Sequence, residues 1–450
     1  MSEVLAEDFR GEPYWWEMSP RAGRPAAPPP LPARADVAIV GAGYAGLAAA
    51  LVLARAGRGV LVLDAGPPGG GASSRSVGMT GGRLRQGAAA LTKALGPGPA
   101  LALMREAAGA YRWFLDFVRA EAIDCDLRQS GRLVGAWTRR DLEAQRRLAA
   151  MLTERIGIDC HVVDRAGLRP EIASDLYHGA LVLPQDGGLH PARLHDGLLQ
   201  RALAAGATVA AFTPVTALAE ESGEVRVLTP AGAVTAREVV LATNAYTGPA
   251  FPWHHRRVIP VGSYMAATEP LSPTRVARLL PAGRLVNDTR RLAYAIRISP
   301  DGTRLLVGGR ASARDHARPP QVARSLHRVL AGVFPELAAA RMSHAWGGMV
   351  AFTFDRLPNI GTRGRVHHVL GCNGSGVVMS TYLGTMLGRR IAGAADAVTG
   401  FARDGLPGAP LYGGRPWFMS PVSLWYGLRD RADRMIDAAR PSPPRGASTP

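Results

Sequence analysis

The chain has 450 residues, of which 47% are hydrophobic and 20% are charged, and this balance excludes a largely disordered protein. One hydrophobic core rarely supports such a length, so two or three domains are expected. The 53 basic residues exceed the 36 acidic residues and give a net charge of +17. Because the basic residues are scattered singly, they favour a solvated basic surface over a groove for nucleic acid.

The cysteines and the hydropathy pattern bear on where the protein is found. Cys125, Cys160 and Cys372 have no paired spacing, which excludes a disulfide framework or zinc motif and favours a reducing compartment. The first residues are charged and lack the apolar segment of a secretory signal. No stretch approaches the roughly 18 apolar residues of a membrane-spanning helix. These features predict a soluble, cytoplasmic protein.

The predicted elements begin after a proline-rich lead at 20–34, so we expect ordered structure to start at Ala35. Strands at 37–40 and 60–64 flank a helix from about Gly46, and this alternation is typical of α/β proteins with a parallel sheet. Further helices are predicted at 99–120 and 139–156, and further strands at 225–228, 238–242, 258–267, 293–298 and 304–308. The Pro/Arg-rich end, 437–450, is expected to be frayed.

These elements predict an α/β protein in which a Rossmann-like dinucleotide-binding domain is discontinuous and a sheet-rich α+β substrate domain is inserted into it. The dinucleotide-binding domain is expected to comprise 35–95, 161–250 and 336–400. The substrate domain is expected to comprise a helical part, 96–160, and a sheet part, 251–335. Residues 1–34 and 401–450 are predicted to be terminal arms.

The strongest motif is an apolar strand followed by Gly41-Ala-Gly43-Tyr-Ala-Gly46, an alanine-rich helix and a second strand ending in Asp64. Gly41 permits the tight turn, Gly43 lets the backbone reach a diphosphate, and Gly46 lets helix and strand pack closely. The helix N-terminus carries a positive partial charge that suits a diphosphate. Asp64 would accept hydrogen bonds from ribose hydroxyls. The pattern predicts a dinucleotide site.

Two other glycine-rich segments favour FAD over NAD as the dinucleotide. The small-residue loop Gly70–Ser76 directly follows Asp64 and is suited to wrap the far side of a diphosphate. Near the other end of the chain, Gly371–Gly376 leads into a predicted helix. A helix N-terminus of this kind can approach the pyrimidine edge of a flavin, where negative charge develops on reduction.

With these motifs the chain resembles the D-amino-acid oxidase-like FAD oxidoreductases, and within them the γ-glutamylputrescine oxidase-type branch. The similarity covers about residues 35–400. Its five ordered blocks are VAIVGAGYAGLAAA, GASSRSVGM, VVLATNAYTG with RVIPVGSYMAATEPL, DGTRLLVGGR, and WGGMVAFTFDRLPNIG with GCNGSGVVMSTYLG. The resemblance implies that the chain oxidises the C–N bond of an amine or amino acid, γ-glutamylputrescine-like or other, to an imine, and that oxygen reoxidises the flavin.

The resemblance also implies which residues contact FAD. They are Gly41, Gly43, Tyr44, Ala45, Gly46, Asp64, Ala65, Ser73, Ser74, Arg75, Val215, Ala242, Thr243, Asn244, Gly374, Ser375, Gly376 and Val377. Some relatives attach FAD through a cysteine at the position of Gly348, and others through a histidine shortly after the ribose acid, where 65–90 contains none. We therefore expect noncovalent FAD, with Arg75 beside the flavin.

The substrate pocket is less well defined. Leu306 and Val378 occupy positions where sarcosine-oxidase-like relatives use lysines, one to activate oxygen and one to hold the substrate carboxylate. Their loss argues against a sarcosine-like substrate. It leaves open a dehydrogenase that uses a quinone or an electron-transfer partner. The candidates for an apolar pocket wall, for which core packing is an equal alternative, are Tyr264, Trp346 and Met349.

Charged and metal-ligating candidates are few. Arg297 and Arg310 are candidates to hold an anionic group or polarise oxygen, or alternatively to form interdomain ion pairs. The pairs 254–255 and 367–368 are adjacent histidines, which on a strand point to opposite faces and lack ligand-spaced partners, so no metal is expected. His190, in a Gly-Gly-Leu-His-Pro turn, is predicted to be structural rather than catalytic.

The tryptophan-rich termini admit two interpretations. Trp15-Trp16, Trp417-Phe418 and Trp425-Tyr426, with the terminal arginines, could form a patch that contacts a membrane or a partner. The simpler interpretation is that both arms pack back onto the body. Two further functional hypotheses also stay open: an RNA-associated flavoprotein, motivated by the charge of +17, and an inert flavin-binding scaffold.

Overall fold

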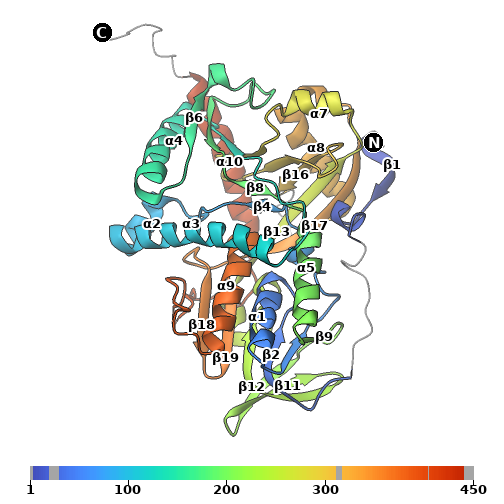
Figure 1. The fold of residues 1–450 in the computed structure, drawn as a ribbon. Coiled ribbons are helices and arrows are strands. Elements are labelled where there is room, and N and C mark those ends of the chain that lie inside the picture. The colour runs from blue at the N-terminus through green and yellow to red at the C-terminus, as the bar shows by residue number, and fades with distance from the viewer. Residues whose placement is uncertain (1–3, 20–29, 311–316, 404, 440–450) are drawn as a thin grey trace.

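The computed structural model describes residues 4–19, 30–310, 317–403 and 405–439, which form two domains, each built on one large sheet (Figure 1). An eight-stranded sheet occupies the lower half of Figure 1, and a nine-stranded sheet occupies the upper half. This is the predicted α/β architecture with a second, sheet-rich domain. No helix in the described ranges is both long and apolar enough to cross a bilayer.

The eight-stranded sheet has the order β10-β11-β12-β2-β3-β9, with β19 pairing β12 and β18 pairing β19. Its strands are β2 (Arg34–Val40), β3 (Val60–Leu63), β9 (Thr208–Ala210), β10 (Ala217–Glu221), β11 (Glu224–Thr229), β12 (Gly232–Leu241), β18 (Asn359–Arg363) and β19 (Val366–Leu370). The pairs β19–β12, β12–β2, β2–β3 and β3–β9 are parallel. Parallel strands are covered on both faces, which explains the continuous apolar runs of β2 and β3.

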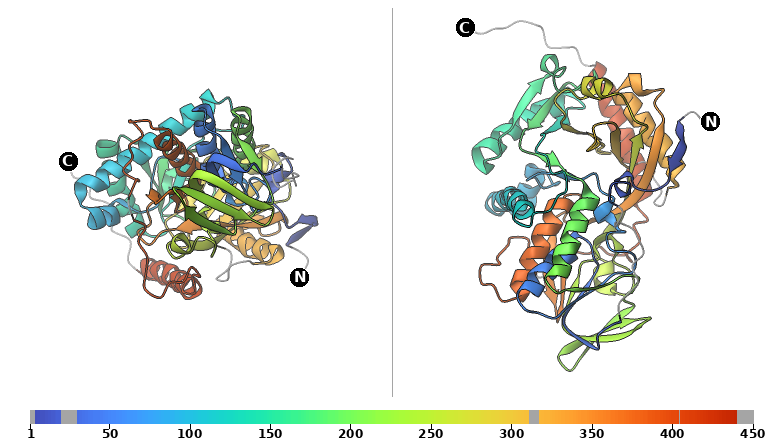
Figure 2. Two further views of the ribbon diagram at one scale, coloured as in Figure 1. Left: turned by 90° about the horizontal axis from the view of Figure 1, so that it is seen from below. Right: turned by 45° about the vertical axis from the view of Figure 1, so that its right-hand side comes forward.

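Helices cover this sheet and share one core with it. They are α1 (Tyr44–Arg55), α2 (Ala88–Leu95), α3 (Pro97–Ala120), α5 (Pro191–Ala204) and α9 (Gly376–Ile391). In the right-hand view of Figure 2, α1, α5 and α9 lie side by side. A Cβ added at Gly384 of α9 would lie 2.3 Å from the Ala45 carbonyl oxygen of α1, so glycine lets these two helices approach.

The nine-stranded sheet has the order β1-β17-β13-β16-β15-β14-β5-β7-β6. Its strands are β1 (Leu5–Arg10), β5 (Arg132–Gly135), β6 (His161–Asp164), β7 (Gly179–Leu183), β13 (Ile259–Thr268), β14 (Leu285–Asp288), β15 (Ala295–Ile298), β16 (Leu305–Gly309) and β17 (Met342–Phe352). The remaining helices are α4 (Arg139–Met151), α6 (Pro252–His255), α7 (Pro273–Leu279), α8 (Pro319–Val333) and α10 (Met419–Ala439). A small ribbon pairs β4 (Met79–Thr80) with β8 (Gly187–Gly188).

The predicted helices and strands are present, but several predicted domain boundaries differ from the structure. The segment 96–160 was assigned to the substrate domain, yet α3 within it packs into the core of the eight-stranded sheet domain. The segments 161–250 and 336–400 were assigned to the dinucleotide domain, yet β6, β7 and β17 belong to the nine-stranded sheet. Sequence pattern predicts that a segment is a strand, whereas long-range pairing decides which sheet it joins.

The prediction that order begins at Ala35 was wrong for the N-terminal arm. Strand β1 pairs in parallel with β17, and a short 3₁₀ turn, Tyr14–Trp16, follows it. The Trp15 side chain is 0% exposed. Burying such an aromatic side chain stabilises the arm by about 1.5–3 kcal/mol, enough to order a short segment that local sequence does not. Most of the proline-rich lead and the end of the C-terminal tail lie outside the described residues.

Candidate cofactor site

The glycine turn after β2 is built as its sequence predicts. Gly41 has φ +108°, and a Cβ there would lie 2.8 Å from the Ala242 carbonyl oxygen. A Cβ at Gly46 would lie only 1.9 Å from the Gly41 carbonyl oxygen. Helix α1 starts after Gly43, which has no side chain to cap the N–H groups of the first turn. Uncapped N–H groups at a helix N-terminus bind anions such as diphosphates.

Asp64 lies immediately after β3, beside this turn. Its Oδ2 accepts a hydrogen bond from the Ala42 amide at 2.7 Å, and its Oδ1 accepts one from Gly66 at 3.0 Å. Burial raises the pKa of the Asp64 carboxyl above its usual range. The Thr213 amide donates to the Asp64 carbonyl oxygen at 2.7 Å, which brings the loop that contains Val215 next to the acid.

The Ser73–Arg75 loop closes over the start of α1. The Ser73 hydroxyl oxygen accepts a hydrogen bond from the Tyr44 amide at 3.1 Å, and the Tyr44 hydroxyl donates to the Ser73 carbonyl oxygen at 2.6 Å. The buried Ser74 hydroxyl donates to the Gly69 carbonyl oxygen at 2.6 Å. Tyr44 therefore links the glycine turn to the small-residue loop, two motifs that the sequence places thirty residues apart.

Two more predicted loops meet at the same edge of the sheet. Asn244, at φ +45°, follows β12, and its side-chain Oδ1 accepts a hydrogen bond from the Gly371 amide after β19 at 3.0 Å. The Asn244 Nδ2 donates to Cys372 Sγ at 3.2 Å. Gly374 has φ +89°, and α9 starts at Gly376. The loops after β2, β3, β12 and β19 thus share the carboxyl edge, where parallel sheets bind ligands.

The contacts and the charge of Arg75 bear on whether the residues of this site fit FAD. Its Nε donates to the Gly70 carbonyl oxygen at 2.8 Å, and its guanidinium lies 4.7 Å from the Trp16 ring centre. Within the described ranges no carboxylate pairs with it, and burial lowers the pKa of the guanidinium. A half-buried cation without a counter-ion, together with a helix N-terminus that begins at a glycine, suits a group with an anionic diphosphate and a ring that gains charge on reduction. The residues fit FAD.

The N-terminal arm is part of this site, which sequence reasoning missed. Trp15 Nε1 donates to the Ser76 carbonyl oxygen and Trp16 Nε1 to the Ser74 hydroxyl oxygen, both at 2.9 Å. The signal in the sequence was the pair of adjacent tryptophans in this short arm. Arg85 was also missed: its side chain lies 3.6 Å from the position of a Cβ on Gly374, and nothing in the local pattern distinguishes it from other arginines.

The nine-stranded sheet separates the three predicted wall residues. Trp346 packs with Met265 and Leu306 on the face toward Val77, and its Nε1 donates to the Arg75 carbonyl oxygen at 2.9 Å. Met265 on β13 is the cross-strand partner of Trp346. Tyr264 precedes Met265 on the same strand, so its side chain must point to the opposite face of the sheet.

On that opposite face, Tyr264 packs into the core beneath α8. Its hydroxyl oxygen accepts a hydrogen bond from the Ala317 amide at 3.2 Å. The structure therefore favours core packing over a pocket role for Tyr264. Met349 lies near the end of β17, where its amide donates to the Tyr246 hydroxyl oxygen at 3.3 Å.

Arg297 and Arg310, the two predicted charged pocket residues, lie on β15 and just after β16. The buried Arg297 donates from one Nη to the carbonyl oxygens of Val77 at 2.9 Å and Leu189 at 2.8 Å. Burial lowers its pKa to about 10. These contacts tie β15 to the Ser73–Val77 region, which favours a structural role. Arg310 donates to the Gly262 carbonyl oxygen at 3.3 Å.

The histidines have structural contacts. His254 lies in helix α6, not on a strand as predicted, and its ring centre is 5.0 Å from that of His368. The His368 Nε2 lies 2.7 Å from Asn359 Oδ1. His190 caps α5, with its Nδ1 accepting from the Arg193 amide at 3.2 Å. The described residues contain no group of three or more His, Cys, Asp or Glu side chains arranged to hold a metal.

A parallel sheet with this glycine turn, an acid directly after the second strand and a second glycine-led helix at the same edge defines the class of proteins with a Rossmann-like dinucleotide-binding domain. The chain belongs to the FAD dependent oxidoreductase family, whose model matches residues 36–390.

Named relatives cover nearly the whole chain. A probable oxidoreductase OrdL from Rhizobium meliloti is 32% identical over 430 residues, which are 93% of this chain and 97% of its own. A gamma-glutamylputrescine oxidoreductase from Escherichia coli is 32% identical over 406 residues, with 88% and 93% covered. Among solved structures, glycine oxidase from Geobacillus kaustophilus is similar with a TM-score of 0.66 and 24% identity, covering 80% of this chain and 94% of that one.

Proposed function

We propose that this FAD enzyme oxidises the C–N bond of an amine or amino acid to an imine, and that oxygen reoxidises its noncovalently held cofactor. The family and the name of the Escherichia coli relative support an amine of the γ-glutamylputrescine type. When bound, FAD would supply the two-electron acceptor for oxidation of the carbon next to nitrogen, and the resulting imine would hydrolyse in water. The protein supplies position and environment.

One observation carries the proposal: the sheet face that packs toward the cofactor loop contains three large apolar side chains and no lysine, and the buried cation on it, Arg297, is held by the carbonyl oxygens of Val77 and Leu189. Met265, Leu306 and Trp346 are each at most 3% exposed and pack against Val77. An apolar wall disfavours an ammonium ion and so lowers the pKa of a bound amine. The neutral amine, which alone can lose a hydride, is therefore the form that binds productively.

We assign roles in this pocket from the same contacts. A Cβ at Gly348 would lie 3.5 Å from Arg75 Cβ, so the sheet approaches the cofactor loop closely at a position that offers no thiol. This supports noncovalent FAD. We infer that Arg75 stabilises negative charge that develops on the flavin, that Trp346 and Met349 line the pocket, and that Arg310 is a candidate for an anionic substrate group.

The test is an anaerobic screen of the purified holoenzyme against amines and amino acids, following loss of flavin absorbance near 450 nm. We expect a γ-glutamylated diamine or a related primary amine to bleach the flavin, and sarcosine to react at least ten times more slowly. Failure of every amine and amino acid to bleach a fully loaded enzyme would overturn the proposal and favour an inert flavin-binding scaffold.

A dehydrogenase that passes electrons to a quinone or an electron-transfer partner is the second candidate. Leu306 favours it, because it stands where the resemblance places an oxygen-activating lysine, and it is 0% exposed in an apolar cluster. After anaerobic bleaching by an amine, air is admitted and hydrogen peroxide is measured. Rapid reoxidation with one peroxide per flavin supports the oxidase, whereas slow reoxidation with fast reduction of a quinone analogue supports the dehydrogenase.

The RNA-associated alternative has less support. Many arginines pair with carboxylates, such as Arg55 with Glu121, Arg284 with Glu171 and Arg291 with Asp433, rather than lining a groove. Steeply salt-dependent RNA binding would revive that hypothesis. The three cysteines are free, which supports our proposal that the reaction takes place in the reducing cytoplasm.

A further inference from the structure

Helix α10 is amphipathic in the reverse of the usual sense: its polar side faces the protein and its apolar side faces outward. Its buried residues, Ser423, Asp430 and Asp437, recur every seven positions and so lie on one side of the helix. The large apolar side chains of α10 lie on the other side. A surface helix of a globular protein normally buries its apolar side instead.

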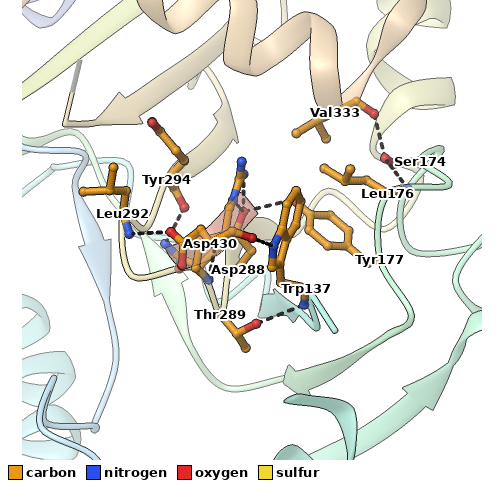
Figure 3. A network of polar contacts seen from close by, with 12 residues as sticks. Trp137, Ser174, Leu176, Tyr177, Asp288, Thr289, Leu292, Tyr294, Val333 and Asp430 are labelled. Carbon is orange, nitrogen blue, oxygen red and sulfur yellow. Dashed lines mark hydrogen bonds and ion pairs between the residues drawn. The ribbon is translucent and has the colours of Figure 1, made fainter. Parts of the chain in front are cut away.

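Hydrogen bonds and ion pairs hold the inner side of α10 to the nine-stranded sheet domain. Asp430 accepts from Arg291 Nη1 at 2.9 Å and from the Leu292 amide at 3.2 Å, and its carbonyl oxygen accepts from Trp137 Nε1 at 2.9 Å. Figure 3 shows Asp430 between Leu292 and Trp137. Asp437 accepts from the Arg139 amide at 3.0 Å. The orientation of α10 is therefore fixed by specific contacts.

The outward side of α10 carries exposed apolar side chains. We call them, with Trp417 two residues before the helix, the outer stripe, and its residues are Trp417, Leu424, Trp425, Leu428, Met435 and Ile436. Each is between 51% and 71% exposed, and they make up half of the twelve large apolar side chains exposed in the described part of the chain. Clustering of this kind marks an interaction surface, whereas single exposed apolar residues are ordinary.

The rest of the chain lacks the side chains to cover the outer stripe. Apart from Met1, the segments outside the described ranges (1–3, 20–29, 311–316, 404 and 440–450) contain no large apolar residue. The sequence that follows α10, RPSPPRGASTP, contains two arginines and no large apolar residue. None of these segments therefore offers large apolar side chains, other than Met1, to pack on the outer stripe.

Charge distinguishes between the possible partners. Exposed Arg429 and Arg431 border the outer stripe, and within the described residues neither pairs with a carboxylate. The acids of α10, Asp430, Asp433 and Asp437, face or pair with the protein body. A symmetric contact with a second copy would bring these arginines together without acids between them. An anionic lipid surface complements both the arginines and the net charge of +17.

We propose that α10 docks this enzyme on an anionic membrane surface, with the outer stripe inserted among the lipid headgroups and the bordering arginines paired with lipid phosphates. Tryptophans such as Trp417 and Trp425 prefer this interfacial depth, and interfacial helices combine apolar and Lys/Arg-rich sides in this way. The proposal is independent of which amine is oxidised. It would also bring the reduced enzyme close to membrane quinones.

The test is flotation of the full-length holoenzyme with vesicles of phosphatidylcholine alone or with about 30% phosphatidylglycerol. We expect binding to the anionic vesicles that weakens with added salt. The double variant Trp425→Glu/Leu428→Glu should lower partitioning more than 100-fold, because two apolar side chains no longer enter the interface. Arg429→Gln/Arg431→Gln should lower it about 10- to 30-fold, at about 1 kcal/mol for each arginine.

The matched control is Leu203→Glu/Val398→Glu, which changes two exposed apolar residues away from α10, 48% and 78% exposed. It should bind vesicles like the wild type, and every variant should keep its FAD content and thermal midpoint. Absence of vesicle binding by the wild type would overturn the proposal. So would a wild-type dimer, seen by analytical ultracentrifugation, that Trp425→Glu/Leu428→Glu converts to a monomer without any vesicle binding, because a second copy would then cover the stripe.

Discussion

The two large sheets contribute to the site in different ways. The eight-stranded sheet presents backbone: glycines at Gly41 and Gly46 allow close approach, and uncapped helix ends offer N–H groups. The nine-stranded sheet presents side chains such as Trp346 and Leu306, and their faces depend on strand register. Changes at the first sheet should therefore remove the cofactor, whereas changes at the second should alter stability or substrate choice.

The largest effect is expected for Gly46→Ala, because the new Cβ would collide with the Gly41 carbonyl oxygen at 1.9 Å. Displacing the glycine turn should destabilise the protein by about 3 kcal/mol and weaken FAD retention at least tenfold. The control is Gly109→Ala in α3, where no atom lies within 4 Å and alanine should stabilise the helix by about 0.5–1 kcal/mol. Flavin absorbance per chain and thermal melting measure both. Equal FAD content in the two variants would contradict the expectation.

Arg297→Met tests whether Arg297, on the nine-stranded sheet, stabilises the fold or instead contacts the substrate. Its loss would remove the Arg297 donor from the carbonyl oxygens of Val77, which is part-buried, and Leu189, which is buried, so we expect destabilisation of about 2–4 kcal/mol with little change in KM. The exposed Arg58→Met serves as control and should melt like the wild type. A raised KM at an unchanged Tm would instead place Arg297 in the substrate pocket.

Asp64→Ala should weaken FAD binding about 10- to 100-fold, because hydrogen bonds from ribose to a charged acceptor contribute about 1.5–3 kcal/mol. It should also lower stability by about 1–3 kcal/mol, because the Ala42 and Gly66 amides lose their acceptor. Asp36→Ala is the matched control, because Asp36 accepts from the Gly59 amide at 2.8 Å at the amino ends of the same parallel strands, away from the glycine turn. FAD dissociation constants from fluorescence titration of the apoprotein separate the two. Equal constants would remove Asp64 from the cofactor site.

The smallest effect concerns pH and the buried pair His254 and His368. Burial lowers their pKa values to about 4 and about 3, from an ordinary 6.5. Below pH 6.5 these two histidines bind protons in the unfolded chain but stay neutral in the folded chain. The free energy of unfolding therefore decreases as the pH falls from 6.5 toward 4. We expect His368→Gln to reduce the loss of unfolding free energy between pH 7 and 5 by roughly 2 kcal/mol, measured by denaturant titration, and the exposed His161→Gln to leave that loss unchanged.

The difference between the sheets also explains what the sequence could predict. The glycine turn, Asp64 and the small-residue loop are local patterns with a backbone reason at each position, and the structure brings them together at one edge. Tyr264 and Trp346 looked equivalent in sequence, but the alternation of neighbouring strand residues places them on opposite faces. That placement depends on pairing between distant strands.

The two termini show the same limit. The sequence grouped the Trp-rich arms together, whereas the structure buries Trp15 completely and leaves Trp425 57% exposed. Long-range contacts decide the outcome: Trp15 enters a core shared by both domains, and the Asp430 contacts turn the apolar side of α10 outward. Local composition predicts neither the burial of Trp15 nor the orientation of α10.

The most direct test of the central claim is the FAD content of the purified chain before and after acid precipitation. We predict a yellow protein with about one FAD per chain, all of which enters the supernatant on precipitation and rebinds on reconstitution at neutral pH. Colour that stays with the pellet would contradict a noncovalent site, and a chain that remains colourless with excess FAD would contradict the cofactor site itself.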